Sequence, residues 1–139
     1  MQRVKALFIT AWSALFSLLG ILALPVALLV VGNVTDYITG IAASQYREEQ
    51  VSSYKGIRGI YKKIGMWILI FIGWMMDMLI GYTVQYIGLN ISLPYIVATV
   101  VAVWLICNEV ISILENLIDI GVDIPPFLMP LAKMIKGQV

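Results

Sequence analysis

Residues 6–35 read ALFITAWSALFSLLGILALPVALLVVGNVT, an apolar run of thirty residues without a formal charge. A helix of about 20 apolar residues crosses the hydrocarbon core of a membrane, which is about 30 Å thick. The run is therefore too long for one comfortable span. Pro25 lies where one helix can end and another begin, because proline is tolerated in the first turn of a helix. We predict one helix over residues 4–23 and a second over residues 25–46.

The composition of the whole chain agrees with a membrane protein. Of its 139 residues, 61% are hydrophobic and only 12% are charged, and its mean hydropathy is +0.95. A soluble domain carries about 25% charged residues, because its surface faces water. The chain is also too short for two independent soluble cores. We therefore expect a single all-α integral membrane domain over residues 1–139.

The chain lacks the residue types on which many catalytic and metal sites depend. It has no histidine and one cysteine, Cys107. Histidine is the commonest metal ligand and a frequent general base, and one cysteine cannot form a disulfide within the chain. We therefore expect no enzymatic activity, no cofactor and no metal site.

Two more apolar segments follow the first run. A basic stretch over residues 47–63 holds five Lys or Arg residues and two Glu residues. We predict a third helix over residues 64–87, a short neutral turn, and a fourth helix over residues 95–121. The tail, residues 122–139, contains three prolines and two lysines, and we expect a short segment at the membrane interface.

The positions of Lys and Arg predict the orientation, because cytoplasmic loops retain these residues. With four spans, all nine fall on the side shared by both termini and the central loop. With the first two helices fused into one span, the division becomes seven against two. Four spans with both termini in the cytoplasm fit better. The alternative is a shallow or re-entrant first hairpin, since the turn near Leu24 holds no polar residue. A cleaved signal peptide is disfavoured, because the apolar run is too long.

Two aspartates lie at membrane depth, each between glycines one helical turn away. Ionisable groups at this depth usually mark a buried interface or an aqueous path. A single small chain offers little interior for two carboxylates, so we expect contact with other subunits or with water in a lumen. The polar residues in question are Asp36, Asp77, Gln85, Asn108, Glu109, Ser112 and Asn116. The small residues, for which packing within the chain is the simpler interpretation, are Gly32, Gly40, Gly73, Gly81, Ser13, Ser17 and Gly20.

The basic stretch has helical spacing. Lys55, Arg58 and Lys62 fall on one face and isoleucines on the other, with Lys63 following directly. Such a helix is expected to lie on the anionic cytoplasmic leaflet, and a simple topology anchor is the alternative. Nucleic-acid binding is disfavoured, because the segment is short and leads straight into a span. Near the end of the fourth helix, Gly121 is suited to a left-handed cap.

Three ordered motifs resemble the phage lysis and toxin-secretion holins, the small holins of Bacillus and clostridial phages and their toxin-release relatives. The first includes Asp36, Tyr37 and Gly40, and the second is a Lys-Gly-x-x-Gly-x-x-x-Lys core with Gly56 and Gly59. The third runs from Glu115 through Gly121 to Pro125. The resemblance covers residues 25–131. Residues 21–24 depart from it, because they replace a polar turn that is common in such proteins.

The resemblance implies a protein that accumulates in the bacterial cytoplasmic membrane and forms large homo-oligomers. Their lesion would release an endolysin or a toxin, and an antiholin would be a further partner. It implies no enzymatic activity. Two other functions stay open: a small ion or solute channel, and a regulatory membrane partner that forms no pore, such as an antiholin or an anchor for a complex.

Overall fold

The computed structural model describes residues 2–47, 53–92, 94–128 and 130. Throughout these residues the regular structure is helical: α1 Gln2–Leu19, a 3-10 turn η1 Gly20–Leu22, α2 Ala23–Tyr46, α3 Ser53–Tyr86 and α4 Ile96–Ile120. Three helical stretches, Gln2–Tyr46, Gly56–Tyr86 and Ile96–Ile120, are long and apolar enough to cross a membrane. The chain is thus an all-helical protein of membrane type.

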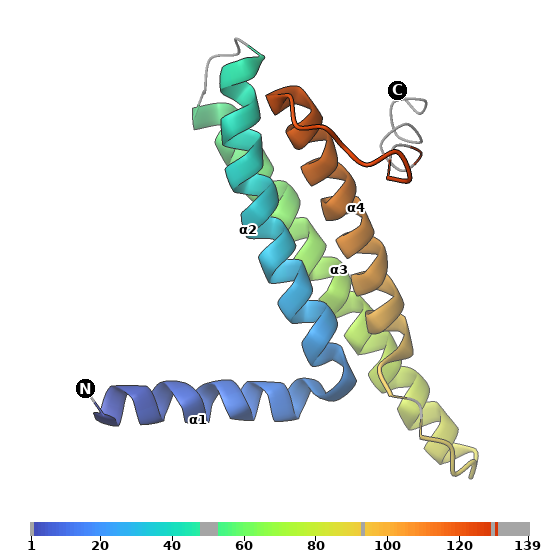
Figure 1. The fold of residues 1–139 in the computed structure, drawn as a ribbon. Helices are drawn as coiled ribbons and strands as arrows, with labels where there is room; N and C mark the ends of the chain where they lie inside the picture. The colour runs from blue at the N-terminus through green and yellow to red at the C-terminus, as the bar shows by residue number, and fades with distance from the viewer. Residues whose placement is uncertain (1, 48–52, 93, 129, 131–139) are drawn as a thin grey trace.

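Helices α2, α3 and α4 form an elongated bundle, from which α1 projects sideways (Figure 1). Helix α4 packs against both α2 and α3, whereas the backbones of α2 and α3 come close to each other at few positions. The end of α2 and the start of α3 lie at the same end of this bundle (Figure 1). Arg47 directly follows α2 at this end. We call this the basic end.

The helix boundaries differ from the predicted ones at two places. Helix α1 ends at Leu19, because Gly20 has φ +52 and turns the chain before α2 begins. Helix α3 begins at Ser53, so most of the segment predicted as a loop continues the spanning helix. At 1.5 Å per residue, its 34 residues reach about 51 Å, which exceeds the hydrocarbon thickness.

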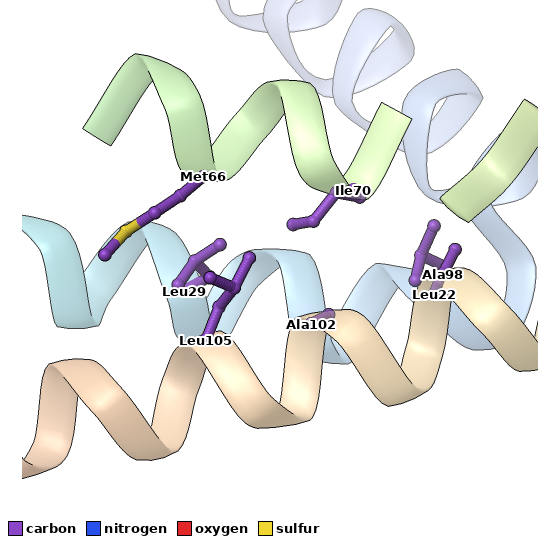
Figure 2. Close-up of a cluster of buried hydrophobic side chains, with 7 residues drawn as sticks. All are labelled: Leu22, Leu29, Met66, Ile70, Ala98, Ala102 and Leu105. Atoms are coloured by element: carbon purple, nitrogen blue, oxygen red, sulfur yellow. The ribbon is translucent and has the colours of Figure 1, made fainter. Parts of the chain in front are cut away.

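A small apolar core joins the three bundle helices (Figure 2). It consists of Leu22, Leu29, Met66, Ile70, Ala98, Ala102 and Leu105. The alanines of α4 let the neighbouring helices approach closely, and Leu29 and Leu105 point toward one another. Most other large apolar side chains of the described residues are exposed, as at Leu79 and Val100. An apolar outer surface of this extent is suited to lipid.

Helices α3 and α4 approach each other closely at Gly73. A Cβ atom added there would lie 2.9 Å from the Cα atom of Ala98 and 3.1 Å from its nitrogen. Only glycine therefore allows α3 to lie against the first turn of α4. At the other end of α4, Gly121 adopts φ +92 and ends the helix in the left-handed conformation that the sequence predicts.

We predict that Gly73→Leu separates α3 from α4 and lowers the free energy of unfolding by about 1–3 kcal/mol, the usual cost of overpacking. Unfolding in mixed micelles, followed by circular dichroism, measures the change. Gly81→Leu is the matched control, because no atom lies within 4 Å of a Cβ added at Gly81. Equal losses in the two variants would contradict the assigned contact.

Candidate functional site

A lysine at the centre of the bundle joins all three of its helices. The Nζ atom of Lys63 on α3 lies 2.8 Å from Asp36 Oδ2 on α2 and 2.7 Å from Glu109 Oε2 on α4. It also donates a hydrogen bond of 3.4 Å to Asn33 Oδ1. The Glu109 side chain is 2% exposed, and those of Lys63 and Asp36 are each 18% exposed. A single ammonium group thus bridges two carboxylates inside the protein.

A second polar group continues from Asp36 toward the basic end. The amide of Asn116 donates to Asp36 Oδ1 at 3.2 Å and to the hydroxyl of Thr39 at 3.1 Å. Its oxygen accepts a hydrogen bond of 3.0 Å from Arg47, whose Nε atom lies 2.7 Å from Asp119 Oδ2. We call this connected set of residues the polar seam: Asn33, Asp36, Thr39, Arg47, Lys63, Glu109, Asn116 and Asp119.

The glycines of α2 make room for the polar seam. A Cβ atom at Gly32 would lie 3.3 Å from the Cβ atom of Glu109, and one at Gly40 would lie 3.6 Å from the amide nitrogen of Asn116. Gly32, Asp36 and Gly40 follow one another at intervals of four residues, so they share one helix face. That face packs against α4, which allows the carboxylate of Asp36 to reach both Asn116 and Lys63.

The polar seam follows one half of the bundle. From Asn33 to Arg47 it extends about 21 Å along α2, at 1.5 Å per residue. The other half, toward the start of α2, contains the apolar core. The five charged residues of the polar seam comprise two cations and three carboxylates. Over the described residues the outer surface of the bundle is therefore mostly apolar, and the charged contacts between its helices lie in the half nearest the basic end.

The second membrane aspartate has a separate role. Asp77 on α3 is 7% exposed, and its two oxygens accept hydrogen bonds of 2.9 Å and 2.8 Å from the backbone N–H groups of Val97 and Ala98. These groups belong to the first turn of α4, where helical N–H groups lack partners within the helix. The residue before the helix, Tyr95, makes no side-chain cap. Asp77 therefore caps α4 from a neighbouring helix, and its charge also suits the helix dipole.

Two expectations from the sequence are corrected by these contacts. The expectation that a single chain offers too little interior for Asp36 and Asp77 is wrong, because α4 lies between α2 and α3 and provides polar partners for both. Lys63, which the sequence groups with Arg58 and Lys62 on one basic surface, points into the bundle, whereas Arg58 and Lys62 are exposed. Lys63 follows Lys62 by 100° around the helix, which turns its side chain inward.

The remaining predicted residues are distributed along the helices. Asn108, Ser112 and Glu115 are half-buried on α4, while Gln85, Tyr37 and Pro125 are exposed, as are Arg58 and Lys62. Ser13, Ser17 and Gly20 are exposed on α1 and η1, and no atom lies within 4 Å of a Cβ added at Gly56, Gly59 or Gly81. The side chain of Lys55 and most of the tail lie outside the described residues.

Four members of the polar seam were not singled out from the sequence: Asn33, Thr39, Arg47 and Asp119. Asn33 and Thr39 lie three residues before and after Asp36, so helical spacing could have identified them. The pairing of Arg47 with Asp119 depends on two helix ends that are distant in sequence. Within the described residues, every buried side-chain nitrogen or oxygen has a hydrogen-bond partner, and no group of acidic or cysteine residues is suited to hold a metal ion.

Comparison with known proteins gives one family and several relatives. The description "Bacteriophage holin family" belongs to the family model that matches residues 13–137. An uncharacterized protein of Listeria innocua is 34% identical over 139 residues, which cover 99% of this chain and 91% of the relative. An uncharacterized protein of Clostridium perfringens is 30% identical over 115 residues, covering 83% and 77% of the two chains. No solved structure matches.

Proposed function

Because the chain belongs to the bacteriophage holin family, we propose that it is a holin that assembles in the bacterial cytoplasmic membrane into a lesion. The observation that carries this proposal is the polar seam. A protomer with a mostly apolar outer surface and charged contacts between its helices has the two surfaces that a lesion requires, one for lipid and one for water. No catalytic role is proposed for any residue.

The polar seam provides a way to change from one surface to the other. In the protomer, Lys63, Asp36 and Glu109 satisfy one another across three helices. Charged groups at bilayer depth require either such partners or water. When protomers associate, α2, α3 and α4 would separate along the polar seam and exchange these contacts for water in the lesion. The half-buried Asn108 and Ser112 would join the same wetted surface.

The orientation proposed here places the basic end in the cytoplasm. Arg47, Arg58 and Lys62 lie there, and cytoplasmic loops retain positive charge. The exposed Tyr54, Tyr61, Arg58 and Lys62 of α3 would rest on anionic lipid headgroups, which attract basic segments. We place both termini on this side, which gives four spans. The cargo would be an endolysin or a toxin, and an antiholin would restrain assembly.

Timed expression in a bacterium tests the proposed function. Membrane potential is followed together with the release of folded cytoplasmic reporter enzymes of increasing size. A holin releases the reporters abruptly and lyses the cell when an endolysin is present. Loss of potential with retention of every reporter would indicate a small channel instead. No effect from the chain expressed alone would indicate a regulatory partner that forms no pore.

A further inference from the structure

An apolar groove lies between α2 and α3, and its lining contains no member of the polar seam. It has a volume of about 800 Å³ and is lined by Val26 and Val30 of α2 and by Trp67, Phe71 and Trp74 of α3, among other residues. Trp12 and Phe16 of α1 form its remaining edge. The groove exists because α2 and α3 both pack against α4 and hardly against each other. Helix α1 thus borders the groove without filling it.

The projecting helix is itself uncovered. Val4, Leu7 and Phe8 are 67–71% exposed, and the amino-terminal half of α1 lies away from the bundle (Figure 1). Its connection to α2 is the short turn η1, in which Gly20 has φ +52. Since glycine adopts many backbone conformations at little cost, this turn is suited to act as a hinge.

The length of α1 and the charge of Lys5 identify α1 as the segment that fits the groove. Suppose that α1 rotated about η1 and lay antiparallel to α2. At 1.5 Å per residue, Lys5 would then lie about 23 Å along α1 from Gly20, and Asp36 lies about 21 Å along α2 from Leu22. Lys5 shares one helix face with Trp12 and Phe16, at intervals of seven and four residues. The face that already borders the groove would therefore bring a cation to the place where two carboxylates share Lys63.

We infer that α1 is a hinged arm that docks in the groove between α2 and α3 of its own chain, with Lys5 beside the partly exposed Asp36. The docked arm fills the apolar groove with its aromatic face and supplies a second cation to Asp36, which shares Lys63 with Glu109. It also takes the amino terminus to the basic end, where the other positive charges lie. The projecting arm in Figure 1 is then the released position. This inference concerns the resting protomer and does not depend on lesion formation.

Cysteine crosslinking in membranes tests the docked position. Phe8 and Val34 each lie twelve residues from the hinge turn, so docking brings them together. Helical spacing of four residues places Phe8 on the face of Trp12, and Val34 on the face of Val30, both of which line the groove. A full chain carrying Phe8→Cys, Val34→Cys and Cys107→Ser is expressed without an endolysin, and a short thiol crosslinker is added before any reporter escapes. We expect a crosslink within one chain, several-fold stronger than in the control pair Leu7→Cys and Val34→Cys, because Leu7 lies on the opposite face of α1.

The charge contact has its own test in the same assay. Lys5→Gln should reduce crosslinking of the Phe8 and Val34 pair several-fold, and Lys5→Arg should restore it. Chains with only one of the two cysteines are also expressed together. Crosslinks found only between such chains would overturn the inference, since α1 of a second copy would then occupy the groove. Absence of any crosslink in inserted protein would overturn it as well, because lipid would fill the groove.

Discussion

Replacing Lys63 with methionine is expected to lower the free energy of unfolding by about 3–5 kcal/mol, the usual cost of leaving a buried charge without its partner. The substitution preserves much of the side-chain length but removes the ammonium group that lies 2.7–2.8 Å from Asp36 and Glu109. The two carboxylates would then face each other without a cation between them. Unfolding of the purified protein in mixed micelles measures the effect.

Two controls separate this contact from a general loss of charge. Lys62→Met removes the neighbouring exposed lysine and should leave the stability nearly unchanged, because isolated surface charges contribute little. The combination of Lys63→Met with Asp36→Asn and Glu109→Gln removes all three charges together. It should recover much of the lost stability, since neutral replacement of a buried charge cluster is often tolerated. If the triple variant were less stable than Lys63→Met alone, the cluster would not be held by charge pairing.

The second large effect is expected from Asp77→Leu, at the opposite end of the bundle. This change leaves the N–H groups of Val97 and Ala98 without their acceptors, which now lie 2.8–2.9 Å away. Because Asp77 is only 7% exposed, water cannot readily replace it as an acceptor, so the loss should be about 2–4 kcal/mol. The first turn of α4 should lose its protection from amide hydrogen exchange, while the rest of α4 stays protected.

Asp77→Asn gives a graded comparison, because the amide keeps one acceptor oxygen but loses the charge. We expect a stability between that of the native protein and that of Asp77→Leu. Gln85→Leu serves as the matched control, because Gln85 is exposed two turns further along the same helix. If Asp77→Leu retained full protection of Val97 and Ala98, the capping role would be wrong.

The sequence predicted the helical class and the apolar segments because these depend on local composition. The thirty uncharged residues from Ala6 to Thr35 exclude a soluble surface whatever the tertiary contacts are. The left-handed cap at Gly121 could be predicted equally well, because it depends only on the conformation of the local backbone. The extension of α3 back to Ser53 could be predicted only in part. The helical spacing of Lys55, Arg58 and Lys62 indicates a helix, but it does not show that this helix continues into the apolar segment.

The partners of the polar residues could not be predicted, because they depend on how helices cross. Helical spacing placed Asp36 between Gly32 and Gly40 but did not show that α4 would lie against that face. Likewise, nothing local distinguishes Lys63, which lies inside, from Lys62, which lies outside, until the direction of α4 is known. The sequence predicts a subunit contact or a lumen for Asp77 and not a cap, because the helix that it caps begins nineteen residues later.

The central claim is that the polar seam inside the protomer becomes the wetted surface of the lesion, and thiol labelling at Ser112 tests it most directly. Ser112 is half-buried on the face of α4 that also carries Glu109 and Asn116. A chain with Ser112→Cys and Cys107→Ser is expressed, and a membrane-impermeant thiol reagent is added before and after reporter release. Val110→Cys, at a similar depth on an exposed face, is the control. The account predicts that position 112 is protected before release and labelled after it, while position 110 stays unlabelled. Protection of position 112 after the reporters have escaped would contradict it.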